Sequence, residues 1–262
     1  LHGLLNILLE QISDFKQSTP LKIKSLSSLS FIIEHCGKLI EPDYFNKNGG
    51  IFQCIYKYLI SEESLIKKCE ECSTIIGKNT NPDILIPLII KSITEIGVDS
   101  SLESIYVRIK FLSNYLSQIN DLSLDNGKLI IKCLSSLDIF NMQPSQYSQN
   151  LLYSYAGVYT SLISCLKEKC ATVHEDLFFP LLLLVSLPET INIRSEITQT
   201  MQNFAKNCKM PLEELYSYEI GNILEKFKST YKTWKKNTPD RFAFDIYVKL
   251  AGPSLEKHWT EV

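Results

Sequence analysis

Two cysteines, Cys69 and Cys72, have the spacing of half a zinc site or of a redox-active dithiol. A structural zinc site needs four ligands, and the sequence contains neither a second Cys-x-x-Cys nor a pair of histidines at ligand spacing. Both cysteines instead fall on an apolar stripe with Leu65 and Ile76 that repeats at helical period. We interpret them as core residues and expect no metal site.

The segment Gly77-Lys78-Asn79-Thr80 is similar to the end of a phosphate-binding loop, which cradles the phosphates of a nucleotide. That loop requires a glycine five positions before its Gly-Lys pair, and Cys72 stands there. We therefore interpret the segment as a helix end followed by a turn. No cofactor is predicted.

General acid-base catalysis needs histidines or carboxylates that converge on one point. None of the histidines has a carboxylate or cysteine partner at ligand spacing. The histidines are His2, His35, His174 and His258. Adjacent glutamates such as Glu213-Glu214 point about 100° apart on a helix, so they do not share a site. The sequence thus predicts a protein that is not an enzyme.

The composition limits which class of protein this chain can be. The chain has 262 residues, of which 45% are hydrophobic and 21% charged, so it can bury an extensive core. The net charge of −2 and the small number of arginines argue against a nucleic-acid partner. The eight cysteines fall mostly on apolar helical positions, which predicts reduced thiols in the cytosol or nucleus. The longest apolar run, Leu177 to Leu187, is about half the length of a membrane helix, so no membrane span is predicted.

A helix-opening signal recurs along the chain, each time followed by an apolar stripe of helical period. The openings lie near Pro20, Glu63, Leu102, Gln146, Thr190 and Pro239, at intervals of 43, 39, 44, 44 and 49 residues. Such a period is typical of the paired-helix repeats of HEAT and armadillo proteins. Each stripe is predicted to be the second helix of a pair, and the more continuously apolar runs, such as Ile84 to Ile90, its partner helices rather than strands.

These patterns predict an all-α fold, an α-α superhelix of the HEAT/armadillo kind with about six helical pairs. We expect residues 1–262 to form one continuous solenoid, and a monomer. Because the chain opens without a methionine and closes within a helical pattern, we expect a fragment of a longer protein. The last pair is expected to be irregular, with one long helix over Tyr216 to Trp234.

Solenoids bind partners through extended surfaces, often the concave one that one set of helices lines. Charges of both signs lie on the predicted exposed side of a second helix. They are Lys67, Lys68, Glu70 and Glu71, and they form the candidate partner-binding site.

A more distinctive block follows the last long stripe. It contains a tryptophan, a Thr-Pro turn, a phenylalanine and an Ala-Gly-Pro breaker, namely Trp234, Thr238, Pro239, Phe244, Ala251, Gly252 and Pro253. This order resembles a segment of the HEAT-repeat dynein axonemal assembly factors, the fifth of that series. The segments Cys69 to Lys91 and Ser186 to Tyr216 are similar to the same family in the same order.

The resemblance extends over roughly residues 25 to 262. It implies a cytoplasmic, non-enzymatic factor that helps to pre-assemble axonemal dynein arms for cilia. The implied partners are axonemal dynein heavy and intermediate chains, chaperones and other assembly factors, and the family contributes no catalytic residues. The alternatives are another HEAT-repeat adaptor, such as a nuclear transport receptor or a kinase-stabilising co-chaperone scaffold, and an enzyme on a helical scaffold.

Overall fold

A computed structural model describes residues 1–95, 101–141 and 148–255, and within these ranges the chain folds into helices without a strand. Contacts between residues divide it into two compact units, Leu1–Cys133 and Leu134–Val262. The division falls inside helix α8 (Leu124–Ser136). Each unit is built from helical pairs, which confirms the predicted all-α repeat class.

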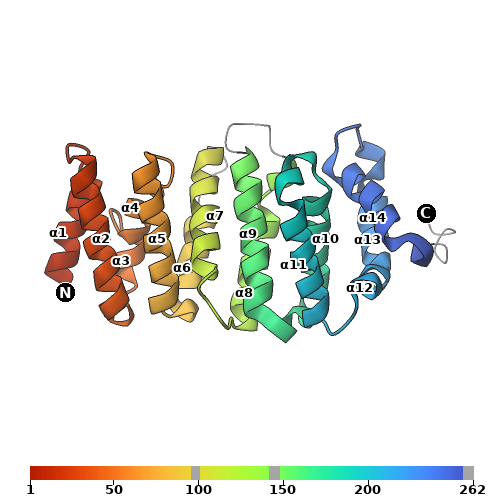
Figure 1. The fold of residues 1–262 in the computed structure, drawn as a ribbon, viewed down its shortest axis with the longest axis horizontal. Helices are drawn as coiled ribbons and strands as arrows, with labels where there is room; N and C mark the ends of the chain where they lie inside the picture. The colour runs from red at the N-terminus through yellow and green to blue at the C-terminus, as the bar shows by residue number, and fades with distance from the viewer. Residues whose placement is uncertain (96–100, 142–147, 256–262) are drawn as a thin grey trace. The chain divides into compact units, whose positions relative to one another are not determined.

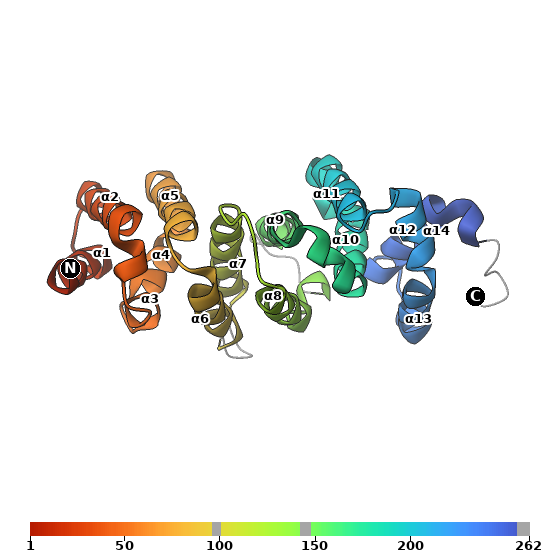
Figure 2. The ribbon, with the colours of Figure 1, turned by 90° about the horizontal axis from the view of Figure 1, so that it is seen from below.

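The first unit contains three such pairs. They are α1 (His2–Ser13) with α2 (Thr19–Cys36), α3 (Asp43–Asn46) and α4 (Ile51–Tyr58) with α5 (Glu63–Asn79), and α6 (Pro82–Thr94) with α7 (Leu102–Leu116). The second helices α2, α5 and α7 pack on one another in succession and lie side by side in Figure 1. Figure 2 shows α2 and α5 in one layer and α4 and α6 in the other. The apolar stripes are buried between these layers.

The second unit begins with the same arrangement. Helix α9 (Ser148–Leu166) packs on α11 (Arg194–Asn207), and α10 (His174–Ser186) packs on both. The last three helices are α12 (Leu212–Tyr218), α13 (Ile220–Thr230) and α14 (Pro239–Leu255). Here α14 packs against α10 and α12 packs against α11, so the second helix of this pair no longer lies on the preceding second helix. This exchange confirms that the last pair is irregular.

The predicted helix openings agree with the structure at Pro20, Glu63, Leu102 and Pro239, within one residue. Proline suits the first helical turn because its missing N–H has no partner to lose there. The opening near Gln146 lies outside the described residues. The opening near Thr190 was wrong, because Thr190 lies in a 3-10 segment, Pro188–Ile193, and α11 begins only at Arg194.

Threonine favours the position just before a helix, which is why the sequence indicates a helix opening near Thr190. Thr190 is fully buried, and its hydroxyl donates to the carbonyl oxygens of Leu184, in the preceding helix, and of Leu187, just after that helix. With the helix starts of the structure, the second helices begin 39 to 46 residues apart. The long last interval of 49 residues was therefore an error of placement, and the last pair owes its irregularity to its packing.

The single long helix expected over Tyr216 to Trp234 was also wrong. The chain breaks between α12 and α13 at Glu219, and the helix ends at Thr230, so Trp234 follows in extended backbone. Glu219 is 1% exposed, and its carboxylate contacts Nδ1 of His174 and accepts a hydrogen bond from Nδ2 of Asn222 at 3.2 Å. A stripe of correct period does not detect a break that keeps its apolar residues buried.

The apolar runs lie in helices, as predicted, and Pro87 and Pro180 lie inside α6 and α10. Over the described ranges, no single helix has the length and hydropathy to cross a membrane, although His174–Ser186 and Pro188–Asn207 pass that test together as a pair bent by 99°.

Candidate functional site

The candidate charges on α5 are already paired, and only Lys67 and Glu71 are exposed, while Lys68 and Glu70 are half-buried. Lys67 forms an ion pair with Glu63 at 2.6 Å, one turn earlier on the same helix. Lys68 pairs with Glu71 at 2.7 Å. The Lys67–Glu63 pair is largely exposed and contributes little to stability, and the Lys68–Glu71 pair lies within one helix, so neither distinguishes a docking site from an ordinary helix face.

Glu70 has a different role from its neighbours. Its carboxylate lies 2.6 Å from Nζ of Lys110 on α7, and the Lys110 side chain is only 17% exposed. Burial lowers the pKa of Lys110, but the hydrogen bond that its ammonium group donates to Glu70 and the negative charge of that carboxylate raise the pKa above its ordinary value. This pair joins two neighbouring second helices. The role of Lys67, Lys68, Glu70 and Glu71 in partner binding stays a prediction.

Cys69 and Cys72 lie in the core between the helices, both fully buried. Burial raises the pKa of Cys72 to about 12 and that of Cys69 above its ordinary value. A buried, protonated thiol is neither a nucleophile nor a metal ligand. In the part of the chain that the structure describes, no three His, Cys, Asp or Glu side chains are grouped to hold a metal ion.

The block that begins at Trp234 forms an aromatic cluster at the corner between α13 and α14. The indole ring lies 5.6 Å from the rings of Phe227 and Phe244, and those two rings meet edge to face at 5.3 Å. The indole N–H donates to the hydroxyl of Thr230 at 3.0 Å. Such pairs add stability beyond the apolar area that they bury, so the cluster fixes the path of the chain into α14.

The remaining members of that block shape the backbone. The Thr238 hydroxyl accepts a hydrogen bond from the backbone N–H of Lys235 at 2.6 Å, and Pro239 begins α14. Ala251 is buried, while Gly252 takes φ = +34° and interrupts the helix, which an L-residue with a side chain rarely does. The side chain of Pro253 lies outside those that the structure describes. The block is thus a structural corner.

A groove of about 650 Å³ lies in the first unit, at the ends of α2 and α5. It is lined by two exposed aliphatic side chains, Leu39 at 72% and Ile84 at 46% exposure, over the buried ring of Phe45. Lys38 and Glu41 stand beside them, so the charge at its rim is balanced. The two exposed aliphatic side chains at this groove make it a candidate contact surface.

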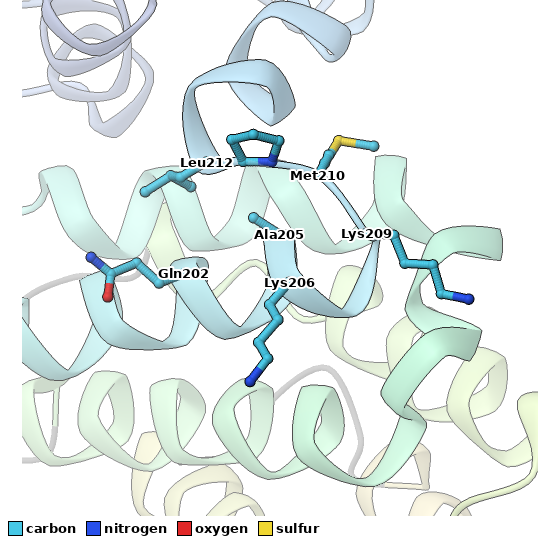
Figure 3. Close-up of a pocket in the computed structure, with 7 residues that line it drawn as sticks. Gln202, Ala205, Lys206, Lys209, Met210 and Leu212 are labelled. Atoms are coloured by element: carbon cyan, nitrogen blue, oxygen red, sulfur yellow. The ribbon is translucent and has the colours of Figure 1, made fainter.

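A second hollow, of about 370 Å³, lies in the second unit where α11 turns into α12. Its floor is apolar, from Ala205, Met210, Pro211 and Leu212, and the polar residues are Gln202, Lys206 and Lys209. Figure 3 shows Ala205 below the segment that carries Met210 and Leu212, with Gln202, Lys206 and Lys209 around it and extending outward. We call this hollow the α11–α12 pocket.

The turn beside this pocket has an unusual residue at its centre. The backbone N–H of Met210 donates to the carbonyl of Ala205, and that of Lys209 donates to the carbonyl of Lys206, both near 3 Å. These two bonds define a Schellman motif, which ends a helix on one left-handed residue that is usually glycine. Here that residue is Lys209, at φ = +61°. Its ammonium group reaches Glu168 at 3.1 Å.

Sequence reasoning missed both hollows. Met210-Pro211 follows a helix of correct period, and proline shortly after a helix end is a known stop signal. That signal could have located the turn between α11 and α12. The left-handed lysine could not have been expected, because the residue type that marks this position is glycine.

Comparisons with known proteins agree on one family. The family model described as dynein axonemal assembly factor 5, HEAT-repeat domain, matches residues 1–188. The human protein dynein axonemal assembly factor 5 is 20% identical over 263 aligned residues, which cover 97% of this chain and 28% of that protein. The chain therefore spans less than a third of the relative that it matches.

Two solved structures, both of engineered proteins, also align along most of the chain. One has a TM-score of 0.42 at 12% identity, covering 97% of this chain and 96% of that one. The other has a TM-score of 0.41 at 14% identity, covering 96% of this chain and 58% of that one. The fold assignment rests on the helix pairs themselves.

Proposed function

The chain belongs to the HEAT-repeat family of dynein axonemal assembly factor 5, and on that premise we propose that it is a non-enzymatic scaffold for the pre-assembly of axonemal dynein arms in the cytoplasm. The observation that carries the proposal is the family match over residues 1–188. The proposed partners are axonemal dynein heavy and intermediate chains, chaperones and other assembly factors.

The arrangement of the described residues supports a role in protein binding. Helical pairs stack so that each buries its apolar stripe on its neighbours, which leaves the polar helix faces and the turns as the available surface. The groove at Leu39 and Ile84 and the α11–α12 pocket both lie at such turns. We propose that the charges of α5, with Lys67 and Glu71 outermost, contribute to the same kind of contact.

The test is affinity capture with this chain from cells that are building motile cilia, with the bound proteins measured by quantitative mass spectrometry. We expect enrichment of axonemal dynein heavy and intermediate chains together with chaperones. Recovery of only transport cargo or kinases would contradict the proposal and favour another kind of HEAT-repeat adaptor.

Two controls make the capture specific. Cells of the same type that carry no motile cilia should yield the chaperones without the axonemal dynein chains. A variant with Lys67→Glu and Glu71→Lys keeps the net charge and tests the α5 face. If this variant recovers dynein chains as well as the unaltered chain, the α5 face is not a partner site, although the scaffold function still stands.

A further inference from the structure

We propose that the α11–α12 pocket binds an acidic segment of a partner protein that inserts one apolar side chain between acidic residues. The inference rests on the proposed scaffold function, since it names the chemistry of one partner contact. The structure offers an apolar floor and a cationic rim in one place, and both are needed to select this kind of ligand.

The floor accounts for the apolar side chain. Ala205 is buried at its base, while Met210 and Leu212 are half-buried and Pro211 is exposed. Methionine is flexible and adapts its shape to a neighbour, which makes it frequent at surfaces that accept several related partners. The hollow of about 370 Å³ is open and shallow, so it suits a side chain presented by an extended segment rather than an enclosed small molecule.

The rim accounts for the charge. Lys206 is exposed and has no ion pair in the described part of the chain, and Gln202 beside it is exposed and uncharged. Lys209 pairs with Glu168 at 3.1 Å, where both side chains are more than 70% exposed, so solvent screens that pair and a ligand carboxylate can compete for the ammonium group. No acidic residue lines the pocket.

The nearest acidic residues in sequence are Glu213 and Glu214, and both are exposed. They occupy the first turn of α12, where the helix dipole favours negative charge, and they follow Leu212 without lining the pocket. The left-handed backbone at Lys209 ends α11 there and places this side chain at the rim of the pocket, where its ammonium group pairs with the exposed Glu168.

The probe is a fluorescein-labelled synthetic peptide with one leucine between two pairs of glutamates, and binding to the purified chain is followed by fluorescence anisotropy. We expect saturable binding that weakens as salt is added, because exposed ion pairs are screened. A peptide with lysines in place of the glutamates should not bind. Replacing the leucine by serine should weaken binding about fivefold or more, because an apolar side chain loses its contact with the floor.

Two variants of the chain test the rim. Lys206→Glu should weaken binding about five- to tenfold, since it turns an attraction into a repulsion. Lys209→Gly should weaken it by a smaller factor, and because glycine suits the left-handed position, the turn is retained and any loss of binding belongs to the ammonium group. The matched control is Lys236→Glu, which makes the same charge change in the connection between α13 and α14, at an exposed residue outside the pocket lining.

The anisotropy results either support or overturn the site. Loss of affinity in Lys206→Glu and Lys209→Gly, with Lys236→Glu unchanged, supports the site. Equal losses of affinity in Lys206→Glu and Lys236→Glu overturn the proposal, because the attraction then comes from net charge alone. Binding of the peptide to the unaltered chain that never saturates overturns it as well. Peptide binding without recovery of dynein chains from cells would sink the proposed function and leave this site standing, whereas recovery of dynein chains without peptide binding would do the reverse.

Discussion

Gly77 on α5 approaches Tyr115 on α7 so closely that a β-carbon built on the glycine would lie 2.3 Å from the tyrosine's backbone carbonyl oxygen. Both residues are fully buried or nearly so, and the contact is with backbone, which cannot rotate away as a side chain can. The absence of a side chain at Gly77 therefore sets the distance between two neighbouring second helices. The glycine that suggested a phosphate-binding loop in the sequence serves helix packing instead.

We expect Gly77→Ala to destabilise the first unit by about 1 to 3 kcal/mol, because the added methyl group must force α5 and α7 apart. The measurement is urea-induced unfolding followed by circular dichroism. The control is Gly221→Ala in α13, where nothing lies within 4 Å of the new β-carbon, so alanine should stabilise by up to about 1 kcal/mol. If both variants gained stability, the close approach would not exist in solution.

Ile109 on α7 is fully buried in the stripe that faces the neighbouring helices. Ile109→Asp should cost more than about 4 kcal/mol of unfolding free energy, because it places an unpaired charge in the core. The change in melting temperature gives the result directly. Ser28→Asp on the exposed side of α2 introduces the same group in water and should leave the melting temperature nearly unchanged. A variant at Ile109 that melted like the unaltered chain would contradict the assignment of the stripe to the core.

The buried thiols should be unreactive in the folded chain. Burial raises the pKa of Cys72 and Cys170 to about 12, so at neutral pH almost none of either is present as the reactive thiolate. With iodoacetamide and peptide mapping, the half-buried Cys36 should be alkylated first, and Cys72 only after urea is added. Rapid alkylation of Cys72 in the native chain would contradict the packing of α5.

The same shift makes stability depend on pH at the alkaline end. In the unfolded chain Cys72 ionises near its ordinary pKa of 9.0, whereas in the folded chain its pKa is about 12. Between these values the folded state holds a proton that the unfolded state has lost, so the unfolding free energy falls as the pH rises. Cys72→Ala should make this fall less steep than in the unaltered chain. An identical slope in both would show that other groups govern the alkaline loss.

How far the sequence predicts this fold depends on which interaction sets each boundary. Second helices that open on a local signal, such as Pro20 in α2 or Pro239 in α14, are predictable because proline acts through its own ring. The start of α11 is not predictable in this way, because the Thr190 hydroxyl donates to the carbonyl oxygens of Leu184 and Leu187 and does not cap α11. At the break between α12 and α13, the Glu219 carboxylate contacts His174, which lies 45 residues earlier in the sequence, and a local pattern does not report such a contact.

The candidate sites follow the same rule. Helical period placed Lys67 and Glu71 on the exposed face of α5, whereas Lys68 and Glu70 are half-buried. The pairing of Glu70 with Lys110 joins two helices and required the structure. The α11–α12 pocket was missed because its shape comes from a left-handed residue at Lys209, a conformation that lysine does not signal.

The left-handed conformation of Lys209 predicts that replacing it by glycine and replacing Lys206 by glycine change the unfolding free energy in opposite directions. Lys209→Gly should raise the unfolding free energy by about 1 kcal/mol, because glycine adopts the left-handed conformation without the steric penalty that a β-carbon incurs. Lys206→Gly, one turn of chain earlier in α11, should lower it by a similar amount, because there the residue is helical and glycine loses more entropy on folding. Both variants remove one positive charge from the end of the same helix, so the helix dipole affects them alike. Thermal unfolding of the two, measured side by side, isolates the backbone effect, and changes of the same sign would mean that α11 does not end on a left-handed Lys209.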